Sequence, residues 1–147
     1  MFKILKGDIT KAKADVIINA SNTELLHIGG VALAIKNKAG SELIEDSKKI
    51  DYVEIGSFAV TRAGNLNAKE VFHIPTICYR KKRKATIEDI KISFKKALKE
   101  AVKSGYKKIA TPLLGTGVVG LDEKDVENAL REVSFEFKDL EVILYKI

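Results

Sequence analysis

The sequence predicts an α/β fold, with a largely parallel or mixed sheet covered by helices on both faces. Strand-like and helix-like segments alternate along its 147 residues, which is the pattern of α/β domains. The run Val16-Ile17-Ile18 is continuously apolar, as expected of a strand buried on both faces. Two glycine-rich turns, at Gly29-Gly30 and at residues 115–120, each lead from a strand into a helix. The length favours one domain, which we expect to span residues 1–147.

Strands and helices can be placed in order in the first half of the chain. An apolar segment near the N-terminus and the Val-Ile-Ile run are the first two strands. The alanine and leucine content after the first glycine turn favours a helix that ends at Gly40, and Ser41 can cap a second, short helix. Turn residues then bound two further strands, and Pro75 follows the second of them. The expected strands are 2–5, 15–20, 57–61 and 71–74, and the expected helices are 31–40 and 41–50.

The second half of the chain adds two helices and two strands. The basic stretch from Arg80 to Lys84 is predicted to be a loop from its composition. Thr86 then begins the clearest helix, with acidic residues in its first turn, apolar residues at helical spacing and Gly105 as its end. Asp122 can cap the other helix, which we expect to reach about Val133. The expected strands are 108–111 and 140–145.

Composition limits the functions that the chain can have. No apolar run approaches the roughly 20 residues of a membrane span, so we expect a cytoplasmic protein. The single cysteine, Cys78, cannot form an internal disulfide, and two histidines give no zinc cluster, so we expect no metal and no cofactor. The net charge of +6 suits a polyanionic partner but is mild for a dedicated nucleic-acid binder. Abundant Lys, Glu and Ile without glutamine is typical of thermophile proteins.

Both glycine turns have the chemistry of a phosphate site. Glycine allows positive φ and lets backbone amides approach a ligand without a Cβ in between. The helix after each turn adds unpaired N–H groups and the positive end of its dipole, so phosphate oxygens can be held without lysine. Neither turn matches the P-loop, because no Lys-Ser or Lys-Thr follows the glycines. Either turn alone could be an ordinary connection, but two at strand ends predict a diphosphate site outside the sheet.

Four segments of the sequence, taken in order, resemble the macrodomain family. They are residues 7–10 (Gly-Asp-Ile-Thr), 14–22, 27–32 and 112–120. The resemblance covers nearly the whole chain. It implies a single macrodomain over residues 1–147, a three-layer α/β/α fold with a central mixed six-stranded sheet, and ADP-ribose lying across the strand ends.

The resemblance also assigns roles to residues of the expected site. Asp8 matches an acidic residue that accepts a hydrogen bond from the adenine amino group, although Asp8 is equally a turn residue from its own context. Asn22 matches an asparagine that contacts the distal ribose and is implicated in catalysis, whereas Asn19 looks structural. Tyr145 matches an aromatic placed against adenine in some members, with a half-buried strand tyrosine as the alternative. The ligand-binding residues implied are Asp8, Ile9, Asn22, Gly29, Gly30, Val31, Leu114, Gly115, Thr116, Gly117, Val118, Val119 and Tyr145.

Three positions depart from the family's pattern. Ile28 replaces a glycine, Ala32 replaces the catalytic aspartate of one hydrolase subgroup, and Val119 replaces an aromatic. Because members of the family either recognise ADP-ribose on proteins, remove it, or deacetylate O-acetyl-ADP-ribose, we expect an ADP-ribosyl hydrolase, and a slow one. Asn22 would position water, the substrate's own phosphate would assist, and His27 is the proposed proton acceptor. His27 is equally suited to an exposed loop, and a non-catalytic ADP-ribose-binding module is the alternative function.

A third class of function is nucleic-acid binding through the basic stretch 80–84. A basic run of this length is more often a solvated loop, and Tyr79 is the one flanking aromatic that could stack on bases. The expected partner is therefore ADP-ribose or an ADP-ribosylated protein, with weak nonspecific nucleic-acid binding as the alternative. Two further residues are expected to be structural, Cys78 as a small buried apolar residue and His73 as a satisfied core or interface residue.

Overall fold

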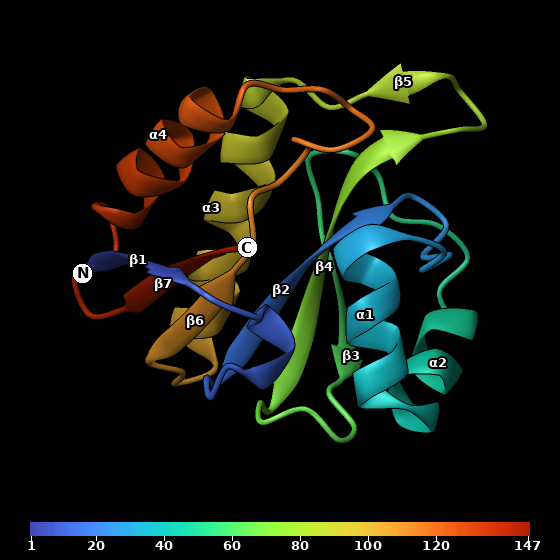
Figure 1. Cartoon of the computed structure of the whole chain (residues 1–147), viewed down its shortest axis with the longest axis horizontal. Coiled ribbons are helices and arrows are strands. Elements are labelled where there is room, and N and C mark those ends of the chain that lie inside the picture. The colour runs from blue at the N-terminus through green and yellow to red at the C-terminus, as the bar shows by residue number, and fades with distance from the viewer.

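The computed structural model describes residues 1–147, and a seven-stranded mixed sheet lies at its centre (Figure 1). The strands are β1 (Phe2–Lys6), β2 (Val16–Asn22), β3 (Ala59–Arg62), β4 (Glu70–Cys78), β5 (Arg83–Lys84), β6 (Lys108–Thr111) and β7 (Glu141–Lys146). The main path is β1-β7-β6-β2-β4-β3, and the short strand β5 pairs with β4. Neighbours from β1 to β4 along this path are parallel, whereas β3 and β5 run antiparallel to β4. The first and last strands of the chain are therefore neighbours at one edge.

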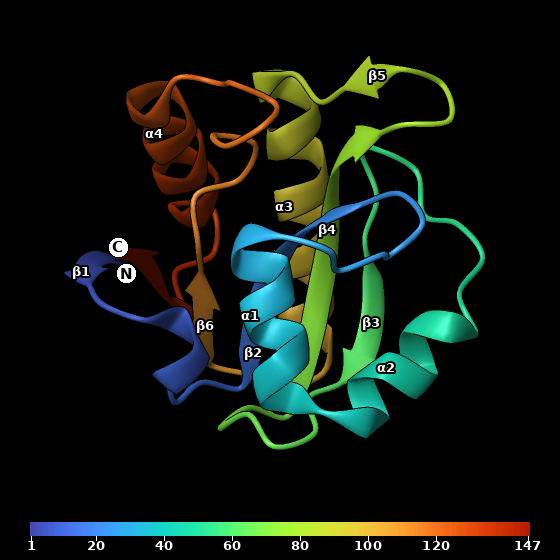
Figure 2. The ribbon, with the colours of Figure 1, turned by 45° about the vertical axis from the view of Figure 1, so that its right-hand side comes forward.

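Helices cover both faces of the sheet (Figure 2). On one face, α1 (Gly30–Ala39) packs against β2 and α2 (Ser41–Lys48) packs against β3. On the other face, α3 (Ile87–Lys103) and α4 (Glu123–Ser134) pack on each other. A short 3-10 turn, η1 (Ile9–Lys11), follows β1 and contacts α1 on the first face. The three-layer α/β/α fold with a mixed sheet is confirmed. None of the helices is both long and apolar enough to cross a membrane.

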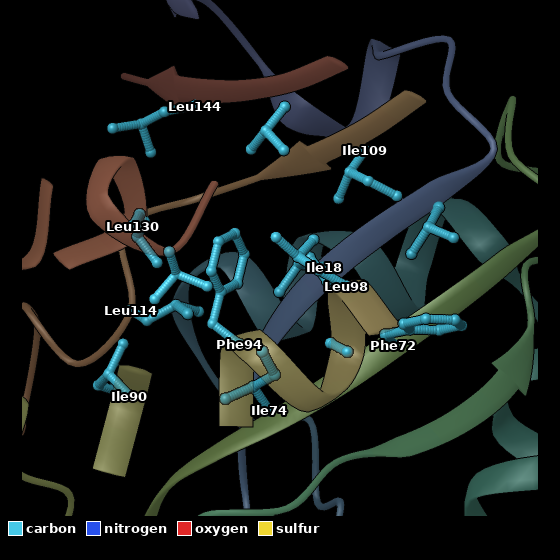
Figure 3. Close-up of a cluster of buried hydrophobic side chains, with 14 of the residues drawn as sticks. Ile18, Phe72, Ile74, Ile90, Phe94, Leu98, Ile109, Leu114, Leu130 and Leu144 are labelled. Carbon is cyan, nitrogen blue, oxygen red and sulfur yellow. The ribbon is translucent and has the colours of Figure 1, made fainter. Parts of the chain in front are cut away.

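The larger core lies between the sheet and the layer of α3 and α4. Phe94 and Leu98 of α3 and Leu130 of α4 are fully buried with Ile18 of β2 and Phe72 of β4 (Figure 3). A smaller cluster on the opposite face joins α1 and α2 to β2 and β4. Each large apolar side chain buried in this way contributes about 1.5–3 kcal/mol. The sheet is thus fixed from both sides, and the loops at its edges start from rigid strand ends.

The region around β4 differs from the sequence-based expectation. The stretch 80–84 was expected to be a loop throughout, but Arg83–Lys84 forms β5 and pairs with Ile77 and Cys78. The preceding strand was expected to end before Pro75, but β4 continues through it. Pro75 is tolerated because it lies between the β3 pairing, which ends before it, and the β5 pairing, which begins after it, so no ladder bond is lost on that side. The six strands of the main path are those predicted, and β5 is the additional seventh.

Candidate ligand-binding site

A cavity of about 490 Å³ opens at the carboxyl ends of the parallel strands. Four segments that are distant in sequence line it: the end of β1 with the following turn, the first residues of α1, Pro112 after β6, and the end of β7. The volume is that of a small-molecule site. Open α/β sheets bind ligands beyond the carboxyl ends of their strands, and the cavity occupies this position. The lining residues expected from the sequence are Asp8, Ile9, Gly30, Val31 and Tyr145.

Asp8 begins η1, and Thr10 holds its carboxylate in one orientation. The backbone N–H and the hydroxyl of Thr10 both donate to Asp8 Oδ1, at 2.9 and 2.8 Å. These two hydrogen bonds, that of the hydroxyl first, lower the pKa of Asp8. The carboxylate is therefore ionised at neutral pH, and Oδ2 accepts no hydrogen bond within the protein. Asp8 is thus both the turn residue that its context indicated and an acceptor facing the cavity.

The N-terminus of α1 presents backbone N–H groups that no side chain caps. Gly29 is the N-cap residue and offers no side-chain acceptor, whereas α3 and α4 each have a capping side chain. The N–H groups of Gly30, Val31 and Ala32 donate no hydrogen bond within the protein. Gly29 and Gly30 are also exposed. Three free donors at the positive end of a helix dipole are suited to an anion such as phosphate.

The turn after β6 presents a second row of free donors. The backbone N–H groups of residues 116–119 donate no hydrogen bond within the protein. Two bonds close the turn, from Gly120 N–H to Gly117 O at 3.0 Å and from Leu121 N–H to Gly115 O at 2.9 Å. Gly115 has a φ of 76°, and a Cβ there would contact the Leu121 side chain at 2.9 Å, so this position requires glycine. The neighbouring Leu114 is fully buried in the larger core, so its side chain is not available to a ligand.

Asn22 closes the turn that leads to the first glycine pair. Its Oδ1 accepts hydrogen bonds from the backbone N–H groups of Glu24 and Leu26, at 3.1 and 3.0 Å, and its Nδ2 donates to the Leu26 carbonyl at 2.9 Å. The residue is buried and does not line the cavity. The amide is thus engaged in holding the loop, and its contact with a distal ribose stays a prediction.

His27 lies in a buried polar cluster beneath the same loop. Its ring stacks on that of His73, with 5.0 Å between the centroids, and its Nε2 lies 3.0 Å from Ser47 Oγ of α2. Asn19 Nδ2 lies between the two rings, 3.0 Å from His73 Nδ1 and 3.4 Å from His27 Nδ1. The other nitrogen of His73, Nε2, lies 2.8 Å from Thr61 Oγ1. The cluster therefore joins the loop to β2, β3, β4 and α2.

One arrangement of hydrogens satisfies both rings of this cluster. The Asn19 amide donates one hydrogen to each Nδ1, and each Nε2–H donates to a hydroxyl, so both rings are neutral. Burial, with a smaller effect of Lys36, lowers the pKa of His27 to about 4. Burial, and then His27, lower the pKa of His73 to about 3. The structural roles expected of Asn19 and His73 are confirmed, and the exposed-loop alternative for His27 is wrong because the residue is only 4% exposed.

Tyr145 lines the cavity from β7, and a buried carboxylate of α4 fixes the strand end beside it. Glu127 accepts hydrogen bonds from Lys146 Nζ at 2.6 Å and from Lys124 and Arg131 at 3.1 Å each. The hydrogen bond from Lys146 is the largest cause that lowers the pKa of Glu127 to about 2. Tyr145 itself is half-buried, as the strand-tyrosine alternative required, and it faces the cavity as well.

The family model described as Macro domain matches residues 18–130 of this chain. The chain belongs to the macro domain family. One relative of this macro domain is an O-acetyl-ADP-ribose deacetylase of Escherichia fergusonii, 38% identical over 121 residues that make up 80% of this chain and 68% of the relative. Another is a protein of Aquifex aeolicus, 35% identical over 144 residues that make up 97% of this chain and 87% of the relative.

Solved macro domains share the fold of this chain. The macrodomain of Mycobacterium tuberculosis DarG superposes with a TM-score of 0.89 at 23% identity, covering 100% of this chain and 98% of that one. A mutant Oceanobacillus iheyensis macrodomain with ADPR superposes with a TM-score of 0.87 at 23% identity, covering 97% of this chain and 83% of that one. At these identities, the likeness establishes the architecture.

Some lining residues of this macro domain were not expected from the sequence. Thr10 could have been found, because a hydroxyl two residues after an aspartate is a common partner of its carboxylate. Ala34 could also have been found, since it lies one helical turn after Gly30. Ile28, one of the departures from the family's pattern, is 70% exposed and does not line the cavity. The lining residues missed are Lys6, Gly7, Thr10, Ala34, Pro112 and Ile147.

Proposed function

We propose that this macro domain binds ADP-ribose and slowly hydrolyses ADP-ribosyl adducts, with mono-ADP-ribosyl protein or O-acetyl-ADP-ribose as the substrate. The observation that carries the binding proposal is the pair of donor rows, one at the uncapped start of α1 and one at residues 116–119. Together they offer seven backbone N–H groups without a partner in the protein. Two rows of free donors at one sheet edge match the two phosphates of a diphosphate.

The orientation of the ligand follows from the cavity. Asp8 Oδ2 is a free anionic acceptor, which suits an adenine amino group, and Tyr145 offers an aromatic ring on the same side. The adenosine would therefore occupy the cavity, with the diphosphate along the two donor rows. The distal ribose would then lie beyond Gly29, near the loop that Asn22 closes. The relative named as an O-acetyl-ADP-ribose deacetylase supports the choice of ligand.

Hydrolysis at this site would have to rely on the positioning of water and substrate. His27 does not line the cavity, the Asn22 amide is occupied by the loop, and Ala32 has no acidic group. None of these side chains provides a free general base, so the ligand's own phosphate would have to take the proton of an attacking water. Turnover should accordingly be slow. The same observations favour the second candidate function, a module that binds ADP-ribose without hydrolysing it.

Calorimetry with ADP-ribose, AMP and NAD tests the binding proposal. We expect micromolar affinity for ADP-ribose, weaker binding of AMP, which lacks the diphosphate, and poor binding of NAD. Asp8→Ala should weaken ADP-ribose binding about tenfold or more, since it removes a charge-assisted hydrogen bond. Asp139→Ala is the matched control, because Asp139 is an exposed carboxylate before β7, at the other end of the strands. No heat with ADP-ribose, or an equal effect of the two variants, would refute the proposed site.

Release of free ADP-ribose separates the hydrolase from the binding module. Mono-ADP-ribosyl protein and O-acetyl-ADP-ribose are incubated with the wild-type protein and with Asn22→Ala, and products are followed by chromatography. A slow release or deacetylation that Asn22→Ala abolishes supports hydrolysis. Because the Asn22 amide also holds the loop, thermal unfolding and ADP-ribose affinity of Asn22→Ala are measured alongside. Tight binding without any product identifies the binding module instead.

A further inference from the structure

The loops of the site follow one another along the sheet in strand order. Because β1, β7, β6, β2 and β4 are parallel neighbours, their carboxyl ends lie side by side along one edge. Asp8 follows β1, Tyr145 lies near the end of β7, and the two donor rows follow β6 and β2. The next place along this edge follows β4, where residues 79–84 form a basic hairpin (Figure 1). ADP-ribose with its adenine at Asp8 would point its distal ribose, and any attached carrier, toward the basic hairpin.

The basic hairpin is an ordered element joined to the loop of the site. Its turn is closed by a hydrogen bond from Lys82 N–H to Tyr79 O at 3.2 Å, and its two strands pair through β5. Arg80 lies 3.7 Å from Glu24, which is part of the turn that Asn22 closes. Arg83 pairs at 3.0 Å with a carboxylate in the first turn of α3. The hairpin is thus held at a fixed place beside the distal end of the site.

The charge that this hairpin presents to solvent comes from lysine. Lys81, Lys82 and Lys84 are exposed, and none lies within ion-pair distance of a carboxylate, whereas both arginines are paired. Glu54 lines a small cavity of about 120 Å³ under the hairpin together with Lys81, and the balance of charge there is still positive. Tyr79, at the start of the turn, is 55% exposed and provides an aromatic face beside the lysines.

These features fit a single-stranded nucleic acid better than an acidic peptide. The planar fork of arginine suits carboxylates and phosphates alike, but both arginines of the hairpin already pair with carboxylates of this chain, so the lysines and Tyr79 are left to contact a partner. Lysines act as point charges for phosphate, and the exposed ring of Tyr79 can stack on any base, a contact that an acidic peptide does not offer. We propose that the basic hairpin binds the phosphate backbone of a single-stranded nucleic acid.

Fluorescence anisotropy with a labelled oligothymidylate of about 12 nucleotides tests the hairpin, since single-strand sites span about 4–16 nucleotides. Three lysines that each neutralise one phosphate predict a slope of log K against log salt of about −2. Replacing Lys81, Lys82 and Lys84 together with alanine should bring this slope close to zero and weaken binding at least tenfold at low salt. Tyr79→Ala should weaken binding about tenfold with little change in slope.

The matched control removes the same charge elsewhere. Lys96, Lys99 and Lys103 are exposed, unpaired lysines of α3, and their triple alanine variant should bind the strand like the wild type. An equal loss in the control variant would show diffuse attraction and overturn the proposal. Tighter binding of a glutamate-rich peptide of matched charge would overturn it as well.

Calorimetry with ADP-ribose keeps this inference separate from the proposed function. The hairpin lies beyond the distal ribose, so the variant of Lys81, Lys82 and Lys84 should bind free ADP-ribose like the wild type. A protein that binds ADP-ribose but not the strand would refute the hairpin proposal alone. A protein that binds the strand but not ADP-ribose would refute the proposed function alone.

Discussion

The two buried histidines make the stability of the fold depend on pH between about 6.5 and 3. His27 and His73 are the only histidines of the chain, and both are neutral in the folded protein. Their pKa values of about 4 and about 3 lie below the ordinary value of 6.5 that the unfolded chain should show. The unfolded state therefore binds more protons between these values. Stability is complete above about pH 6.5 and is lost as the pH falls toward about 4 and 3.

The size of the loss at about pH 5 can be worked out from these values. Both folded pKa values lie below pH 5, so neither ring is protonated there in the folded protein, and both are protonated in the unfolded chain. The unfolded pKa of 6.5 lies about 1.5 pH units above pH 5, and at 1.36 kcal/mol per unit this amounts to about 2 kcal/mol of lost stability for each histidine. The pair should therefore cost about 4 kcal/mol between neutral pH and pH 5. The carboxylates with lowered pKa values, such as Asp8 and Glu127, act only at lower pH.

Urea unfolding at about pH 7, 6 and 5 measures this loss directly. The wild-type protein should lose about 4 kcal/mol, whereas His27→Gln, which keeps a hydrogen-bonding side chain, should lose about 2 kcal/mol over the same range. Thr86→Ala serves as a variant of changed stability but unchanged pH dependence between pH 7 and 5, because the one carboxyl whose pKa Thr86 lowers, that of Asp89, has an ordinary value of 3.8, below this range. A wild-type loss below about 1 kcal/mol, or equal losses in wild type and His27→Gln, would refute the buried neutral pair.

Three further changes follow from contacts of single residues. Gly115→Ala should destabilise the fold by about 1 kcal/mol and weaken ADP-ribose binding, because Gly115 has a positive φ and a Cβ there would approach the Leu121 side chain. Gly117→Ala is the control, since a Cβ at Gly117 would meet open space and should leave stability nearly unchanged. Calorimetry and thermal unfolding compare the two variants. Glu127→Gln should lower the free energy of unfolding at neutral pH by about 2 kcal/mol, a figure reduced because the cationic partners of Glu127 are partly exposed. In denaturant unfolding, the variant should also lack the loss of stability that the wild type shows as the pH falls from 4.5 toward 2. Thr86→Ala should cost about 1 kcal/mol at neutral pH without changing ligand affinity, as denaturant unfolding and calorimetry can show.

Much of the architecture could be predicted because its signals are local. The Val-Ile-Ile run of β2 and the helical spacing of apolar residues in α3 depend on neighbours in sequence, and both elements lie where they were expected. The glycine turns could also be predicted, since glycine permits positive φ and leaves the backbone amides accessible in any fold. Asp8, Gly30 and Tyr145, to which the resemblance assigns ligand contacts, line the cavity, and their contacts with a ligand stay a prediction.

The remaining features depend on partners that are far away in the chain. His27 is buried because its ring packs on His73 and pairs with the hydroxyl of Ser47. Both partners are distant in sequence, so the loop's own residues do not indicate either contact. The Asn22 amide forms its hydrogen bonds with the backbone of its own loop. An asparagine at this position could equally direct its amide toward a ligand, and the residue type does not decide between the two. Pro75 is compatible with β4 because of where β3 and β5 stop and start. Pairing between strands is a property of the assembled sheet.

The pairing of β1 with β7 has a consequence for the order in which the binding site can be assembled. These strands are separated by the whole of the intervening chain, so the loop closed by their contact is the longest in the protein. The two donor rows belong to segments that can dock as soon as β2, β6, α1 and α4 have come together. The adenine end, with Asp8 after β1 and Tyr145 on β7, has to wait for the last strand. A growing chain would thus acquire its phosphate-binding half first and its base-binding half at the final step of folding.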